Sequence, residues 1–145
     1  RAEVTVAPVI RRERRAGAER REIERMEGAR PLVIPNPLKD LRACYFCSLI
    51  KTMQQFYQDG CENCEHFLRM KQDSERVNEC TSANFDGMVG MNDAGSSWVA
   101  KWQCIANEDY ARGVYAISVS GEPHEDVIAS AEERGVHYSS RDKKK

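Results

Sequence analysis

Two segments of the chain alternate with a period of two, residues 85–91 and residues 115–119, and in the first Phe85, Gly87, Val89 and Met91 occupy every second position. In the second segment, Tyr115, Ile117 and Val119 alternate with smaller side chains. Such alternation is typical of a strand that has one face against a core. We therefore predict strands over residues 85–91 and 115–119.

Helical spacing and end signals predict short helices between and around these strands. Thr52, followed three residues later by Gln55, has the form of a capping box that begins a helix ending near Gly60. In this helix Met53, Phe56 and Tyr57 would share one face. A further short helix after Cys64 is indicated by Phe67, Leu68 and Val77.

Two tryptophans mark a compact helix between the predicted strands. Trp98 and Trp102 are four residues apart, so they lie one turn above each other, and Ser96 and Ser97 are suitable caps. Aromatic residues at helical spacing usually belong to a core. We expect Trp102 in the core and leave Trp98 open between the core and a partner contact.

The last predicted helix begins at Pro123 and ends where Gly135 can adopt a left-handed conformation. Its apolar face consists of Val127, Ile128 and Ala131. The order strand, helix, strand, helix predicts an α+β fold with a small antiparallel sheet and flanking helices, attached to a four-cysteine zinc ribbon.

The composition changes near residue 40. Residues 1–40 contain ten Lys and Arg and seven acidic residues, with few large apolar side chains up to residue 30. Such a segment gains little burial to offset the entropy of ordering. We expect a basic, disordered tail with a Pro-rich linker over residues 1–40, a domain over residues 41–142 and a short basic tail at 143–145.

The charge of the remaining chain limits the kinds of partner. Residues 41–145 contain 12 basic and 16 acidic residues. Binding a phosphate backbone requires clustered Lys and Arg, so nucleic acid is not expected as the main direct partner. No apolar run approaches the roughly 20 residues that span a bilayer, and we expect a soluble protein.

Four of the six cysteines form two close pairs. Cys44 and Cys47 are separated by two residues, as are Cys61 and Cys64, and thirteen residues lie between the pairs. No apolar signal segment opens the sequence, so we expect reduced thiols rather than disulfides. Four thiolates at about 2.3 Å close a tetrahedron around zinc and leave no position for substrate. The pattern predicts one structural zinc ion.

Two alternatives for this cysteine pattern stay open at this point. Four free or disulfide-bonded cysteines are one. Rubredoxin-like iron is the other, because four thiolates also suit iron.

The other potentially reactive residues form no catalytic arrangement. Cys80 and Cys104 lie outside the pairs, and we expect both to be buried structural thiols. His66 follows Cys64 closely, but four thiolates already saturate zinc. His124 and His137 have no catalytic partners at a recognisable spacing. We expect no enzymatic activity.

Several motifs in order carry a resemblance to a known family. They are LRAC at 41–44, DGCENC at 59–64, CTSANFDG at 80–87, SWVAKW at 97–102, GVYA at 113–116 and RGVHYSSRD at 134–142. Together these motifs resemble the small zinc-binding subunit of the DSIF transcription elongation factor, whose archaeal counterpart is the E double-prime component of RNA polymerase. The resemblance covers residues 41–142.

The resemblance implies a nuclear, non-enzymatic subunit. It would form a heterodimer with the NusG-like domain of the large DSIF subunit and regulate pausing and processivity of RNA polymerase II. The family's four-stranded antiparallel sheet continues into the partner's sheet, which is strand addition at an edge. Phe85 and Val89 are then candidate interface residues.

The resemblance also implies a partner glutamate at the start of the tryptophan helix, at Ser97 and Trp98. The start of a helix has unsatisfied backbone N–H groups and the positive end of the helix dipole, and both favour a carboxylate there. The simpler alternative is that Ser97 caps its own helix. The competing function is a zinc ribbon that binds nucleic acid directly, which requires basic residues near the knuckles, and only Arg42, Lys51 and Arg69 are close.

Overall fold

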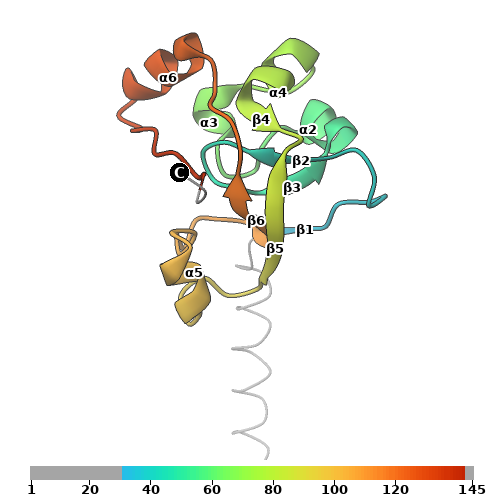
Figure 1. The fold of residues 1–145 in the computed structure, drawn as a ribbon, viewed down its shortest axis with the longest axis vertical. Helices are drawn as coiled ribbons and strands as arrows, with labels where there is room; N and C mark the ends of the chain where they lie inside the picture. The colour runs from blue at the N-terminus through green and yellow to red at the C-terminus, as the bar shows by residue number, and fades with distance from the viewer. Residues whose placement is uncertain (1–30, 143–145) are drawn as a thin grey trace, which may run out of the picture. The chain divides into compact units, whose positions relative to one another are not determined.

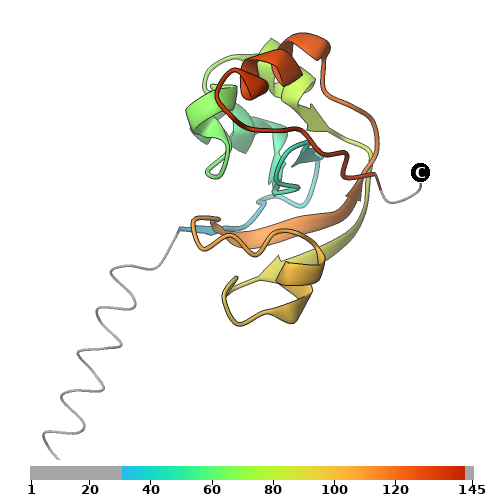
Figure 2. The same ribbon diagram turned by 90° about the vertical axis from the view of Figure 1, so that its left-hand side faces the viewer.

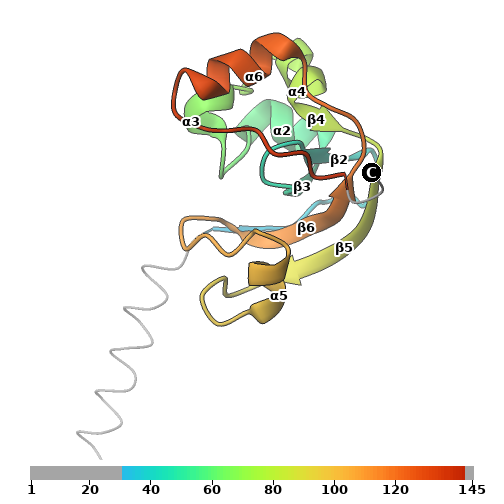
Figure 3. The same ribbon diagram turned by 60° about the vertical axis from the view of Figure 1, so that its left-hand side comes forward.

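The computed structural model describes residues 31–142. Within these residues, two small sheets lie between helices (Figure 1). Figures 2 and 3 show α6 at one end and α5 at the other, with both sheets between them. The helices are α2 (Met53–Asp59), α3 (Glu65–Leu68), α4 (Ser74–Cys80), α5 (Trp98–Trp102) and α6 (Glu125–Glu132).

The first sheet has the strand order β1-β6-β5. Its strands are β1 (Leu32–Val33), β5 (Phe85–Met91) and β6 (Arg112–Val119). β5 and β6 pair antiparallel from Phe85 opposite Val119 to Met91 opposite Gly113. Both strands predicted from alternating residues are therefore present, and β6 begins earlier than predicted.

The second sheet has the order β3-β2-β4 and is antiparallel throughout. Its strands are β2 (Leu41–Cys44), β3 (Ile50–Thr52) and β4 (Thr81–Ser82). The fold is α+β, as predicted, but its strands form two three-stranded sheets rather than the single four-stranded antiparallel sheet that the resemblance implied.

The segment predicted as a linker contributes a strand. β1 pairs parallel with β6, Leu32 opposite Arg112 and Val33 opposite Gly113, and Val33 is buried. The side-chain amide of Gln55 also donates to the carbonyl of Ile34 at 3.0 Å. Residues 31–34 are therefore part of the folded unit. The predictions for residues 1–30 and 143–145 lie outside the described residues.

Local signals set the ends of the helices. The capping box is confirmed, since Thr52 Oγ1 accepts from Gln55 N and the Gln55 side chain accepts from Thr52 N, both at 3.1 Å. α2 ends at Gly60, whose φ of 73° suits glycine. Pro123 precedes the N-cap His124 instead of starting α6, and Gly135 adopts a φ of 76°.

The single helix predicted around Phe67 and Val77 is two helices. Arg69, with φ of 51°, ends α3 in the left-handed conformation, and Gln72 has a φ of 60°. Asp73 then caps α4 by accepting from Arg76 N at 3.0 Å. No glycine signals this break, which is why the pattern of apolar residues alone missed it.

The main core surrounds the cysteine pairs. Its members come from both sheets and all five helices described, and include Leu49, Phe56, Met70, Val77 and Tyr115. A smaller cluster of Ala43, Ile50, Ala116 and Val119 fills the space between the two sheets. None of the helices among residues 31–142 is long and apolar enough to cross a membrane.

Candidate metal centre

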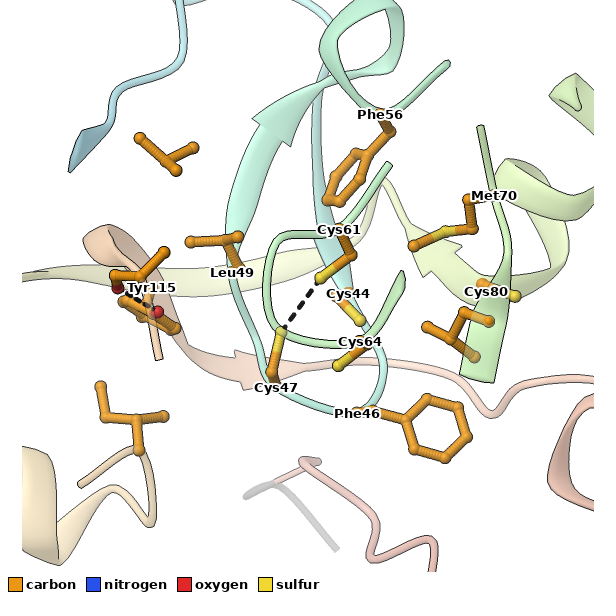
Figure 4. Close-up of a cluster of buried hydrophobic side chains, with 14 of the residues drawn as sticks. Cys44, Phe46, Cys47, Leu49, Phe56, Cys61, Cys64, Met70, Cys80 and Tyr115 are labelled. Atoms are coloured by element: carbon orange, nitrogen blue, oxygen red, sulfur yellow. Dashed lines mark hydrogen bonds between the residues drawn. The ribbon is translucent and has the colours of Figure 1, made fainter. Parts of the chain in front are cut away.

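The four paired cysteines converge on one point. Cys44 ends β2, Cys47 lies in the following turn, and Cys61 and Cys64 occupy the turn between α2 and α3. Their sulfur atoms all lie within 4.8 Å of one another and point toward one another (Figure 4). Each cysteine is at most 2% exposed. In the described part of the chain, this is the only group of side chains that could hold a metal ion.

The spacing of the sulfurs fits a tetrahedral ion. Zinc–sulfur bonds of about 2.3 Å place tetrahedral sulfurs about 3.8 Å apart. The sulfurs of Cys47 and Cys61 are 3.5 Å apart. The site closes on four sulfurs, so it is suited to a structural ion and has no open position for a reactant.

The electrostatics of the cluster also call for a cation. Hydrogen bonds from neighbouring thiols, that of Cys47 first, hold the pKa of Cys44 well below its ordinary value. Burial raises the pKa of Cys61 well above its ordinary value, and the hydrogen bond with Cys44 raises the pKa of Cys64. Protein groups alone thus favour the thiolate of Cys44 and oppose the thiolates of Cys61 and Cys64. A dication offsets the repulsion among four thiolates.

The turn that carries Cys61 and Cys64, which we call the second knuckle, is held by the carboxylate of Glu65. This carboxylate accepts hydrogen bonds from the backbone N–H groups of Cys61 at 3.3 Å, Met70 at 3.2 Å and Lys71 at 3.2 Å. A Cβ at Gly60 would lie 1.9 Å from a Glu65 carboxylate oxygen. Glycine at position 60 therefore leaves room for the acid that shapes the knuckle.

Lys51 supports the same knuckle from β3. The side chain is 1% exposed, and its Nζ donates to the carbonyl of Gly60 at 2.8 Å and to Oε1 of Glu62 at 2.7 Å. Gly60 and Glu62 flank Cys61 directly. Asp59 is a more distant partner, at 3.9 Å and 63% exposed. Sequence reasoning considered Lys51 only as a nearby basic residue, because nothing in the pattern signals its burial.

We expect Lys51→Met to destabilise the zinc-loaded protein by on the order of 3 kcal/mol, because it leaves Glu62 and the Gly60 carbonyl without their cation. Chemical denaturation in the presence of zinc measures this change. Asp59→Asn is the matched control and should change the unfolding free energy by less than about 0.5 kcal/mol. Equal effects of the two substitutions would contradict this account of Lys51.

A closed hydrogen-bond network connects the second knuckle to β6. The Asn63 side-chain amide donates to the Tyr115 hydroxyl at 2.9 Å, and its oxygen accepts from Ala111 N at 2.7 Å. The Tyr115 hydroxyl in turn donates to the Ala111 carbonyl. Burial raises the pKa of Tyr115, which keeps the hydroxyl protonated as this donor. The second knuckle and the β1-β6-β5 sheet are thereby joined through buried polar groups.

Tyr115→Phe is expected to lower the unfolding free energy by about 2 to 3 kcal/mol, since it leaves the Asn63 amide and the Ala111 carbonyl buried without a partner. Denaturant titration of the zinc-loaded protein tests this. Tyr57 is an exposed tyrosine of α2, and the unfolding free energy of Tyr57→Phe should stay within about 0.5 kcal/mol of the wild-type value. A Tyr115→Phe protein as stable as the control would contradict a structural role for the network.

The two remaining cysteines differ from each other. Cys80 is buried as predicted, and burial raises its pKa to about 12, so the thiol stays protonated. Cys104 is exposed, and the prediction that it is buried is wrong. It follows the end of α5 with a φ of 54°, where the chain turns at the surface.

His66 is exposed and lies outside the sulfur cluster. Its ring packs against the ring of Phe67, with 4.8 Å between the two centroids.

None of the residues expected at a partner interface belongs to the sulfur cluster. Trp98 and Trp102 are each 73% exposed, so the prediction that Trp102 belongs to the core is wrong. The short helix α5 buries Ala100 instead. Ser97 caps α5 by accepting from Ala100 N at 3.1 Å, which is the simpler role considered for it.

The two candidates on β5 are packed against the protein itself. Phe85 and Val89 are half-buried beside the smaller and the main core cluster respectively. Met88, between them, is 57% exposed. Sequence reasoning gave no role to Met88, although its place on the polar side of the alternation could have singled it out.

Comparison with known proteins finds one matching family model and several relatives that share one name. The family model described as Spt4/RpoE2 zinc finger matches residues 41–120. The chain is 49% identical over 110 residues to "Transcription elongation factor SPT4" of Drosophila melanogaster, covering 76% of this chain and 93% of the relative. Identity is 47% to the protein of the same name from Caenorhabditis briggsae, covering 74% and 88%. It is 41% to "Transcription elongation factor spt4" of Aspergillus fumigatus, covering 73% and 67%.

These matches include both cysteine pairs and the strands and helices on which they depend. A zinc finger family and four convergent buried cysteines together support one structural zinc ion rather than iron or free thiols. The relatives are named as transcription elongation factors rather than as enzymes. The chain therefore belongs to the Spt4/RpoE2 zinc finger family and has a non-enzymatic role in transcription elongation.

Proposed function

We propose that this chain is the small subunit of a heterodimeric elongation factor in the nucleus. Cys44, Cys47, Cys61 and Cys64 ligate its single zinc ion. Its partner is the NusG-like domain of the large DSIF subunit. Through that partner it acts on the RNA polymerase II elongation complex and regulates pausing and processivity.

The edge of β5 supports strand addition as one part of the interface. In the order β1-β6-β5, β1 covers the other edge of β6, and within residues 31–142 no strand pairs with the outer edge of β5. An edge of seven residues offers a row of backbone donors and acceptors to a partner strand. Phe85 and Val89 contribute through this backbone, and Met88 through its exposed side chain.

The observation that carries the proposal is the exposure of both tryptophans. Trp98 and Trp102 are 73% exposed on α5, which follows the end of β5 (Figure 1). Exposed apolar residues of this size favour a protein partner, because tryptophans are enriched among the residues that dominate binding energy. The partner glutamate implied by the family would meet the backbone N–H groups that follow Ser97, since the Ser97 hydroxyl is engaged in its own cap.

Purification of the tagged chain from nuclear extract tests the proposal. We expect a protein with a NusG-like domain and subunits of RNA polymerase II to co-purify. Their absence would refute the proposal. A tight and steeply salt-dependent affinity of the isolated chain for DNA or RNA would favour direct nucleic-acid binding instead.

A further inference from the structure

The helix that presents the two tryptophans is too short to be stable by itself. α5 spans five residues, Trp98–Trp102, and isolated helices shorter than about 12 residues are marginal in water. Its long side chains point to solvent, and among them Trp98 and Trp102 gain little burial within the chain. The helix must therefore be held at its ends.

The end of α5 has a complete Schellman motif. The N–H of Ile105 donates to the Ala100 carbonyl at 2.9 Å, and the N–H of Cys104 to the Lys101 carbonyl at 3.2 Å. Ile105 and Ala100 are both buried, which is the hydrophobic contact that accompanies this motif. The motif leaves the carbonyls of Gln103 and Cys104 without a helical partner.

Arg141, near the end of the described chain, satisfies both of these carbonyls. Its Nη1 donates to Gln103 O at 3.1 Å and to Cys104 O at 3.3 Å, and its Nη2 donates to Cys104 O at 3.4 Å. Its Nε donates to Phe46 O, between the first two cysteines, at 3.0 Å. The carbonyl of Arg141 accepts from Val119 N, at the end of β6, at 3.1 Å.

Only arginine can make this set of contacts. The guanidinium offers five N–H groups in a rigid plane, while a lysine ammonium is a single point of contact on a flexible stem. A cation next to the last carbonyls of α5 also complements the negative end of the helix dipole. The path of the C-terminal segment, which returns from α6 toward the end of β6, brings this arginine into position (Figure 3).

We propose that Arg141 is a positioning residue for partner binding: it joins the turn between Cys44 and Cys47 to the end of α5 and so holds Trp98 and Trp102 in one orientation. The importance of that orientation rests on the proposed function. The holding of α5 itself does not, and can be measured on the free protein.

The chain offers a direct optical readout of α5. It contains two tryptophans, and both lie on this helix, so tryptophan fluorescence anisotropy reports the motion of α5. Amide hydrogen exchange at Gln103 and Ile105, which donate to Val99 and Ala100 carbonyls, reports the same helix independently. Zinc content and far-UV circular dichroism report the rest of the domain.

Three variants of the full chain show whether Arg141 holds α5 or supports the whole fold. They are R141A, R141K and R134A. Arg134 is the matched control, because it lies in the same C-terminal segment and donates to Phe67 O at 2.6 Å, after the second cysteine pair and away from α5. We expect R141A to lower the protection of Gln103 and Ile105 by about tenfold or more and to lower the anisotropy, with zinc retained. R141K should give protection and anisotropy between those of R141A and wild type. R134A should give the wild-type values of both at α5.

Wild-type anisotropy and exchange at α5 in R141A would overturn the inference. Loss of zinc and of protection throughout the domain in both R141A and R141K would overturn it as well, because Arg141 would then support the whole fold rather than α5.

A second titration distinguishes this inference from the proposed function. If α5 of R141A is ordered in about one molecule in ten, its dissociation constant for the NusG-like domain should rise about tenfold. A loosened α5 with an unchanged dissociation constant would support the role of Arg141 in holding the helix and would contradict the proposed interface at the tryptophans.

Discussion

Cys61→Ser is expected to abolish zinc binding and to unfold the second knuckle and the elements packed on it. A structural zinc site contributes on the order of 10 kcal/mol to folding in finger-sized units, which is comparable to the whole stability of a domain of this size. Cys61 is fully buried at the centre of the main core, so the loss should spread beyond the knuckle to Phe56 and Met70 (Figure 4). Plasma mass spectrometry of the purified protein and thermal denaturation measure the two effects.

Cys104→Ser is the matched control for this experiment. Cys104 is exposed and lies outside the sulfur cluster, so this variant should keep one zinc per chain and the wild-type melting temperature. A folded Cys61→Ser protein with a sharp thermal transition and no zinc would contradict the structural role of the metal. So would a Cys104→Ser protein that loses zinc.

The double substitution Trp98→Ala and Trp102→Ala is expected to weaken binding to the NusG-like domain by at least about a hundredfold. Buried interface tryptophans commonly contribute about 2 kcal/mol or more each, and each 1.4 kcal/mol corresponds to about tenfold in affinity. The two side chains are mostly exposed in the free protein, so their removal should change the free energy of unfolding by less than about 1 kcal/mol. Isothermal titration and denaturation measure the two quantities separately.

Tyr57→Ala is the control for this second prediction. Tyr57 is another exposed aromatic residue, 41% exposed on α2, apart from β5 and α5. Its removal should leave the affinity unchanged. If the tryptophan variant binds as tightly as the Tyr57 variant, the interface lies elsewhere on the domain.

The features that the sequence predicts well are those fixed by local chemistry. Two cysteine pairs with two-residue spacing predict their own convergence, because the ion requires it. Thr52 and Gln55 predict the start of α2 because both partners of the capping box are three residues apart. Strands β5 and β6 follow from alternation, and no distant contact is needed to recognise them.

The features that escaped prediction depend on distant parts of the chain. Helical spacing places Trp98 and Trp102 on one face but does not say whether that face is buried, and the buried residue of α5 is Ala100. The parallel pairing of β1 with β6 joins segments far apart in sequence, and the prolines around β1 favoured a linker.

Charged residues with structural roles are also invisible to pattern reasoning. Lys51 is 1% exposed because Gly60 and Glu62 supply its partners, and Arg141 meets carbonyls in two separate segments of the chain. Charged side chains are almost never fully buried unless they are paired, so a sequence alone gives no reason to expect Lys51 to be buried or Arg141 to be half-buried.

Titration of the NusG-like domain of the large subunit into the purified, zinc-loaded chain tests the proposed interaction most directly. We expect a one-to-one complex that forms with wild-type protein, is lost after zinc removal by a chelator, and is lost in the double tryptophan variant although that variant stays folded. A zinc-loaded, folded wild-type chain that forms no complex with this domain would contradict the account.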